Sequence, residues 1–199
     1  MNTNEEKAAV RKEMRRRRSE IPPDVLSDIN ESLPDYIFSI EDDELQSKLR
    51  NAKRIALYRS FKGEVPVDGL ARAFMARGIK CCFPRTDNGN MLFCDCDDLD
   101  GDEFETSVLG IKEPVSSKPA VDPRSIDVVV LPAVAYNEEG ARLGMGGGYY
   151  DRFAGDQGDD RPYLLGVCYA FQICSDLPVT DQDVIVDFIA VIPEEVYGE

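Results

Sequence analysis

Histidine is absent from the 199-residue sequence. Its absence excludes the Ser-His and Cys-His pairs of nucleophilic catalysis, a histidine general base and histidine-ligated metals. Any chemistry must therefore use carboxylates, lysine, arginine or tyrosine side chains, backbone dipoles, or hard cations bound by oxygen atoms.

Long apolar runs and an amino-terminal targeting signal are also missing. No apolar run approaches the roughly 20 residues that cross a bilayer. The first 18 residues, MNTNEEKAAVRKEMRRRR, lack the apolar segment of a secretory signal. These absences predict a cytoplasmic protein with no membrane partner. The length and the 43% hydrophobic content suit a single domain over residues 1–199.

Paired cysteine motifs are lacking as well. The six cysteines include no CxxC pair. Cys94 and Cys96 could hold a soft metal, but no second ligand pair occurs at a usable spacing. We therefore expect reduced thiols that are buried or half-buried.

Positive charge is scarce outside the amino terminus. The net charge is −15, yet residues 1–20 carry seven basic and four acidic side chains, so the remainder carries −18. An acidic body repels nucleic acid, which is excluded as a partner. The basic segment is the exception and suits a small polyanion.

The apolar pattern predicts an α/β fold. Helices are expected over 5–21, 24–33 and 34–50, the last opened by Pro34, then over 67–78 and from about 148. Strands are expected over 54–58, 79–84, 91–94, 126–132, 163–169 and 184–192, and 97–125 reads as an acidic loop. This alternation is typical of a mostly parallel sheet with 126–132 near its centre, which binds ligands beyond the carboxyl ends of its strands.

A glycine-rich loop follows the predicted central strand. Residues 140–152 read GARLGMGGGYYDR, with four glycines among positions 144–148. Bare backbone amides at the start of a helix hold phosphate, Arg142 can neutralise phosphate oxygens, and Asp151 can hold Mg²⁺. The loop is neither a Walker A motif nor GxGxxG. A flexible turn would also explain the glycines, but the charged flanks favour phosphate binding.

The segment RLGMGGGYYDR resembles the hallmark of the 5-formyltetrahydrofolate cyclo-ligase family, also called methenyltetrahydrofolate synthetases. Further segments resemble the family's landmarks in the same order along the chain: KAAVR, ALYRSFKGEVPVDGL, CCFPR, GIKEP, DVVVLPAVAYNEEGARLG and YAFQICSDLPVTDQDVIVD. The resemblance covers nearly the whole sequence.

The resemblance implies a monomeric, three-layer α/β/α sandwich with a mostly parallel central sheet. It also implies a ligase that forms a C–N bond, closing 5-formyltetrahydrofolate, with or without a polyglutamate tail, to 5,10-methenyltetrahydrofolate. ATP would be the co-substrate, Mg²⁺ the metal, and ADP and phosphate the products. Transfer of the terminal phosphoryl group to the formyl oxygen would activate the formyl carbon, which the neighbouring bridge nitrogen attacks. Such transfer needs positioning and charge stabilisation more than a strong base.

The resemblance also assigns roles to residues. Lys7 and Arg11, four apart on one helix face, match the pair that reaches ATP. Arg142 is expected to stabilise charge on the transferring phosphoryl group. The remaining matches are Gly144, Gly146, Gly147 and Gly148 for the phosphates, Tyr149 and Tyr150 for closing the nucleotide and folate site, Asp151 and Asp183 for Mg²⁺, and Glu64 and Arg59 for folate.

Some positions depart from the family pattern. Met145 and Gly147 stand where some members carry a basic residue, and Gln182 stands where many have a histidine. The run Arg15 to Arg18 is expected to face solvent and has no assigned role.

Two other functions remain open from the sequence. One is a relative that binds nucleotide without turnover. The other is an isomerase or transferase of phosphorylated metabolites on a similar sandwich, which would leave Glu64, Lys7 and Arg11 unused.

Overall fold

The computed structural model describes residues 3–108, 110–180 and 183–197. The helices are α1 (Thr3–Ser19), α2 (Pro23–Ser39), α3 (Asp43–Asn51), α4 (Asp68–Ala76) and α5 (Tyr149–Gln157). The strands are β1 (Arg54–Ala56), β2 (Lys80–Asp87), β3 (Asn90–Asp95), β4 (Phe104–Thr106), β5 (Lys112–Pro114), β6 (Val128–Leu131), β7 (Ala135–Tyr136), β8 (Arg142–Leu143), β9 (Tyr163–Tyr169) and β10 (Phe188–Ile192). Short 3₁₀ segments cover Pro123–Ser125, Gly158–Asp160, Ala170–Gln172 and Glu194–Val196.

Six strands form the central sheet, in the order β10-β9-β6-β1-β2-β3. All neighbouring pairs are parallel except β2 and β3, which are antiparallel. All four residues of β6 are buried, and β6 lies between β9 and β1. The prediction of a mostly parallel sheet with this strand near its centre is confirmed.

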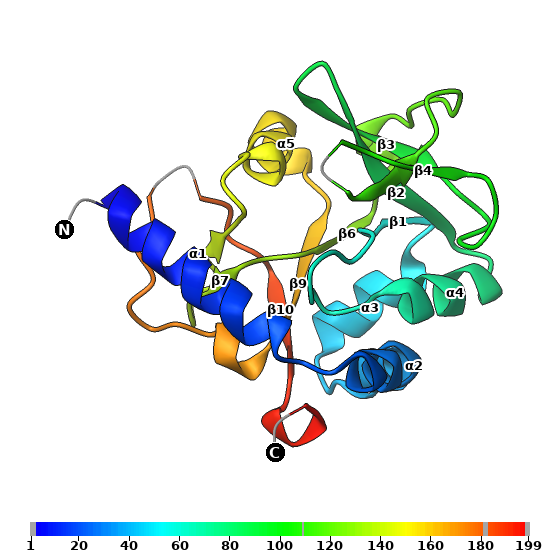
Figure 1. The fold of residues 1–199 in the computed structure, drawn as a ribbon. Helices are drawn as coiled ribbons and strands as arrows, with labels where there is room; N and C mark the ends of the chain where they lie inside the picture. Colours follow the sequence, from blue (N-terminus) through cyan, green and yellow to red (C-terminus); the bar gives the residue numbers. More distant parts are fainter. Residues whose placement is uncertain (1–2, 109, 181–182, 198–199) are drawn as a thin grey trace.

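Helices cover both faces of the sheet (Figure 1). Alternate strand residues point to opposite faces: Ile55 and Val128 pack with α2, α3 and α4, whereas Ala56 and Val129 pack on the α5 side. The three-layer α/β/α arrangement is confirmed. Helix α1 instead packs through Met14 against the β7–β8 hairpin, to one side of the sheet.

The predicted helix boundary at Pro34 is wrong. Pro34 lies inside α2, whose buried face, Ile29, Leu33 and Ile37, continues past it. Proline lacks the N–H that would bond to the carbonyl of Asn30. Gly69 at the start of α4 lies directly over that carbonyl and donates its own N–H to the Asn30 side chain at 2.8 Å. Burial of the continuous apolar face therefore keeps the helix intact at a residue that usually ends one.

Two further predictions need correction. The segment 97–125 is not all loop, because β4 and β5 pair within it as an antiparallel hairpin. The last strand begins at Phe188 rather than at 184, since Val184 and Val186 turn inward beside the hairpin segment around Ala141. Asn88 and Gly89, which both have positive φ, form the turn between β2 and β3.

Candidate active site

One face of α1 lies against the glycine loop. Lys7, Arg11, Met14 and Arg18 follow one another at spacings of three or four residues and therefore share a face. Arg11 Nε donates to the Gly144 carbonyl at 2.9 Å, a contact across 133 residues of sequence. The expected common face of Lys7 and Arg11 is confirmed: Arg11 contacts the loop and Lys7 contacts Asp183.

The glycine loop is held from both ends. Arg152 in α5 donates from Nη1 to the Gly147 carbonyl at 3.0 Å, opposite the Arg11 contact to Gly144. Gly146 and Gly148 have φ of +107° and +63°, which side chains rarely permit. A Cβ on Gly147 would lie 2.8 Å from the ring of Tyr149. The loop is thus a turn that leads into α5 and that needs glycine at these positions.

Arg142 is a buried cation beside the loop, with 4% of its surface exposed. Nη1 donates to the Pro132 carbonyl at 2.9 Å and Nη2 to Asp151 Oδ1 at 3.2 Å. Its guanidinium carbon lies 5.2 Å from the ring centre of Tyr150. Its Nε is buried with no hydrogen-bond partner among the described residues. The side chain therefore retains an unpaired donor where β6 ends and the loop begins.

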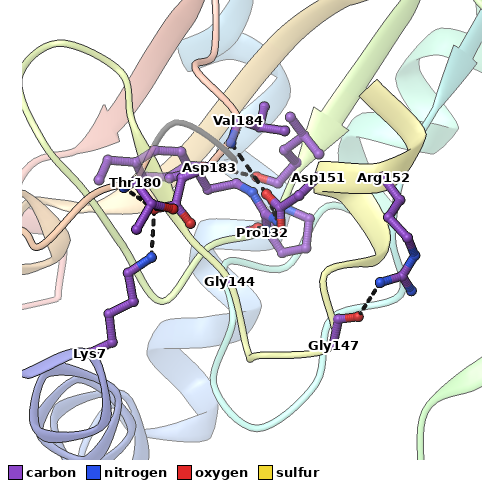
Figure 2. A network of polar contacts seen from close by, with 12 residues as sticks. Lys7, Pro132, Gly144, Gly147, Asp151, Arg152, Thr180, Asp183 and Val184 are labelled. Atoms are coloured by element: carbon purple, nitrogen blue, oxygen red, sulfur yellow. Dashed lines mark hydrogen bonds and ion pairs between the residues drawn. The ribbon is translucent and has the colours of Figure 1, made fainter. Parts of the chain in front are cut away.

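Two carboxylates near the glycine loop, Asp151 and Asp183, form ion pairs (Figure 2). Lys7 Nζ donates to Asp183 Oδ2 at 2.6 Å, and the Thr180 amide donates to the same oxygen at 2.7 Å. Asp151 Oδ1 accepts from the Val184 amide at 3.3 Å as well as from Arg142. Burial raises the pKa of Asp183, but the contacts with Lys7 and Thr180 outweigh burial and lower it.

This donor set is suited to a hard cation. Carboxylate oxygens are the protein ligands that Mg²⁺ prefers, and Mg²⁺ usually takes only one or two of them and completes its shell with water and substrate phosphates. Within 3–108, 110–180 and 183–197, no three His, Cys, Asp or Glu side chains gather into a complete metal cage. A pair of carboxylates beside a loop suited to phosphate fits the ion.

A cavity of about 480 Å³ opens between α5 and the carboxyl ends of β1, β2 and β6. Its walls are mostly apolar and aromatic. Eight residues singled out from the sequence line it: Arg59, Glu64, Arg142, Gly144, Gly147, Gly148, Tyr149 and Tyr150. Arg15, Tyr58, Phe61 and Met91 also line it and were not predicted. The other predicted site residues are not part of this lining: Lys7, Arg11, Gly146, Asp151 and Asp183.

Glu64 enters the cavity from the loop between β1 and α4. Its Oε2 accepts from the Phe61 amide at 3.0 Å, and its Oε1 lies 3.6 Å from Arg18 Nη1. Burial raises the pKa of Glu64 above its ordinary value, and Arg18 is the strongest of the influences that oppose this rise. The prediction that the whole run Arg15 to Arg18 faces solvent is wrong for Arg18, which is 1% exposed.

Arg59 lies on the same loop as Glu64, but its guanidinium is largely engaged elsewhere. Nη1 donates to the Leu99 carbonyl at 3.3 Å, and Nη2 pairs with Asp68 at 3.3 Å. The guanidinium stacks on Phe104, 4.6 Å from the ring centre. Arg59 thus ties the cavity wall to the segment 99–104.

The cysteines form no disulfide. All six are free; five are buried and Cys174 is half-buried, as the sequence predicted. No described helix is long and apolar enough to cross a membrane. Gln182, one of the departures noted in the sequence, lies outside the described residues.

Sequence reasoning missed Arg18 because it treated four consecutive arginines as one charged run. The signal was present in the helical spacing, since positions 7, 11, 14 and 18 share a face that includes the apolar Met14. A face with an apolar member is expected to be buried, and its cations then need partners.

Comparison with known proteins shows the family to which the chain belongs. The sequence pattern of the 5-formyltetrahydrofolate cyclo-ligase family matches residues 3–192. The chain belongs to this family. The matched range includes every residue of the glycine loop, both carboxylates and Glu64.

Named members of the family are similar along most of the chain. The 5-formyltetrahydrofolate cyclo-ligase of Escherichia coli K12 is 32% identical over 137 residues, which cover 67% of this chain and 74% of that protein. The Mus musculus enzyme of the same name is 28% identical over 153 residues, covering 71% and 74%.

Solved structures of the family share the fold. The 5,10-methenyltetrahydrofolate synthetase of Aquifex aeolicus has a TM-score of 0.75 and 26% identity, covering 93% of this chain and 89% of that one. The Mycoplasma pneumoniae synthetase has a TM-score of 0.70 and 25% identity, covering 95% and 98%.

Proposed function

We propose that this protein is a cyclo-ligase that converts 5-formyltetrahydrofolate to 5,10-methenyltetrahydrofolate at the expense of ATP. One observation carries the proposal within the family: the glycine loop that suits phosphate and the cavity that suits a folate share Arg142, Gly144, Gly147 and Gly148 as a common wall. A bound nucleotide and a bound folate would therefore meet at this wall.

The nucleotide phosphates belong on the glycine loop. Its amides precede α5, so the helix dipole adds to their attraction for anions. Arg11 extends from α1 to this loop, and Lys7 extends from the same helix face to Asp183, so the two add positive charge to a chain whose net charge is −15. Arg142, which lines the cavity next to Gly144, is placed to neutralise charge on the transferring phosphoryl group.

Asp151 and Asp183 would hold Mg²⁺ at this place. When bound, the ion would neutralise phosphate charge and fix the geometry of the triphosphate. Lys7 contacts Asp183 and Arg142 contacts Asp151. Both cations are therefore next to the carboxylates and close enough to bind phosphate oxygens beside them.

The cavity would hold the folate. Its volume of about 480 Å³ falls in the range of small-molecule sites. Glu64 can accept hydrogen bonds from the amino-pyrimidine edge of a pteridine, while Tyr58 and Tyr150 line the cavity with aromatic surface. Arg142 and Tyr150 would place the formyl oxygen next to the phosphates.

The proposed reaction balances as follows. The formyl oxygen attacks the terminal phosphorus and ADP leaves. The bridge nitrogen then attacks the activated formyl carbon, phosphate departs with the former formyl oxygen, and the bridge nitrogen loses its proton to solvent. No step requires a strong base, which agrees with a histidine-free site.

The test mixes purified protein with 5-formyltetrahydrofolate and Mg·ATP and follows the near-ultraviolet absorbance of the methenyl product together with ADP. We expect both products in equal amounts and neither without ATP. ATP binding with no folate-dependent ADP would instead indicate a non-catalytic relative. Light scattering in the same buffer tests the proposed monomer.

A further inference from the structure

Arg18 is a cation in an unusual environment. It lies in the last turn of α1 and is 1% exposed, and none of its three guanidinium nitrogens has a hydrogen-bond partner among the described residues. The nearest carboxylate is Glu64, with 3.6 Å between Arg18 Nη1 and Glu64 Oε1. A buried charge is costly unless an opposite charge compensates it, so the burial of Arg18 depends on Glu64.

The backbone around Glu64 fits tightly against the end of α1. Lys62 and Gly63 have φ of +49° and +73°, and a Cβ on Gly63 would lie 2.5 Å from the Arg18 carbonyl oxygen. The Phe61 amide holds Glu64 Oε2 at 3.0 Å. One oxygen of Glu64 is thus fixed by its own loop and the other faces Arg18.

The groups around Glu64 leave Arg18 as its main compensating charge. Burial raises the pKa of Glu64 above its ordinary value, and Arg18, the Phe61 amide and Arg142, in that order, limit the rise. The tyrosines that interact electrostatically with Glu64 have pKa values raised by burial, so they stay neutral: Tyr58, Tyr136, Tyr150 and Tyr169.

We propose that Arg18 is a positioning residue for the cyclo-ligase reaction: it keeps Glu64 ionised and oriented as a hydrogen-bond acceptor at the cavity wall. The substrate group it serves is a hydrogen-bond donor on the pteridine ring, so this inference rests on the proposed function. Arg18 itself does not touch the folate.

Arg18→Met tests this, because methionine fills much of the same space without charge. An opposite charge nearby lowers the pKa of a carboxyl group by about one to three units. Without Arg18, a smaller fraction of Glu64 is ionised near neutral pH, so the KM for 5-formyltetrahydrofolate should rise about tenfold. The KM should recover toward the wild-type value as the pH is raised and Glu64 ionises. The KM for ATP should stay unchanged.

Arg16→Met is the matched control. Arg16 belongs to the same helix but is exposed and pairs with Glu13 and Glu20. Its removal subtracts the same charge and should leave both KM values at wild-type levels. An unchanged folate KM in Arg18→Met, or an increase that does not vary with pH, would overturn the role assigned to Arg18.

A second comparison separates action through Glu64 from loss of packing. In a Glu64→Gln background, Arg18→Met should change the folate KM no further, since its target is gone. If Arg18→Met alone does not fold, the Arg18→Met/Glu64→Gln double variant provides the test. Recovery of the fold in the double variant would support the pairing of Arg18 with Glu64, and failure to fold would contradict it.

An NMR titration tests the inference independently of turnover. In protein with ¹³C-labelled glutamate carboxyl groups, Glu64→Gln identifies the Glu64 resonance. The pH at the midpoint of the Glu64 titration should rise in Arg18→Met by about one unit or more, and it should be unchanged in Arg16→Met. Absence of turnover in the wild type would contradict the proposed function. An unchanged Glu64 titration midpoint in Arg18→Met would contradict the role of Arg18.

Discussion

At the residue scale, the site is built from cations that already contact carboxylates or carbonyls. Arg142 bonds Asp151 and Pro132, and Lys7 bonds Asp183. Each of these cations has further donors that a phosphate can use. Substitutions here therefore affect both the proposed chemistry and the fold, and conservative changes are needed to separate them.

Arg142→Met should lower turnover by about 10²–10³-fold, the usual cost of removing one donor to developing negative charge. Because Arg142 is buried, Asp151 and the Pro132 carbonyl lose a partner, and stability should fall by about 1–3 kcal/mol. Turnover and urea unfolding measure the two effects. Arg124→Met removes an exposed arginine paired with Asp122 and should behave as wild type. Full turnover in Arg142→Met would exclude it from the mechanism.

Asp151→Asn should raise the Mg²⁺ concentration needed for half-maximal turnover. The amide oxygen can still accept from Arg142 and Val184, so the fold should persist while the charge on the metal side is lost. We expect this concentration to rise about tenfold or more, because even the loss of a hydrogen-bond partner of a metal ligand lowers metal affinity by that much. Asp156→Asn, exposed on the same helix, is the control. An unchanged Mg²⁺ requirement would reassign the metal site.

At the element scale, the packing of α4 on α2 shows how two helices accommodate a proline. The Asn30 carbonyl, which Pro34 leaves without its helical donor, faces the backbone of Gly69. A Cβ at position 69 would lie 1.9 Å from that carbonyl oxygen. Only a residue without a side chain permits α4 to come this close, and α4 follows directly on the loop that carries Glu64.

Gly69→Ala should therefore destabilise the protein by about 1–3 kcal/mol, the usual range for overpacking. Gly155→Ala is the matched control, because a Cβ on Gly155 in α5 meets nothing within 4 Å. There alanine should stabilise by roughly 0.5–1 kcal/mol, since it restricts the unfolded chain and suits a helix. Urea denaturation measures both. Equal stabilities of the two variants would show that α2 and α4 can move apart.

At the scale of the whole molecule, contacts between distant segments assemble the site. Lys7 and Asp183 are 176 residues apart, and their ion pair joins α1 to the segment before β10. Arg18 and Glu64 join the other end of α1 to the loop after β1. Helix α1 thus connects the proposed metal site to the proposed folate cavity.

The Lys7–Asp183 contact makes stability depend on pH with a defined sign. Burial raises the pKa of Asp183, but Lys7 and Thr180 lower it overall. A carboxyl group with a lowered pKa stabilises the fold above its unfolded value of about 3.9 and loses that contribution as the pH falls through the lower folded value. The stability difference between wild type and Asp183→Asn should therefore be largest near neutral pH and shrink in acid. Urea unfolding across that range measures it, and a constant difference would contradict the ion pair.

Much of the fold and part of the site followed from local patterns. Apolar β-branched runs marked the strands, and the glycines with Arg142 and Asp151 marked the loop, because backbone conformation and charge there depend on neighbouring residues. Pro34 was misassigned because its tolerance depends on α4, and the β4–β5 hairpin was missed because its strands are short and largely exposed.

The sequence by itself determined the alternation of strands and helices, the phosphate-suited loop and the absence of histidine chemistry, since each is a property of composition or short-range spacing. Only the tertiary structure decided which arginine of the amino-terminal run is buried, which carboxylate faces which cation, and that loop and cavity share a wall. Those features arise from contacts between residues more than a hundred positions apart or on separate elements, where packing and desolvation, rather than local propensity, select the partner.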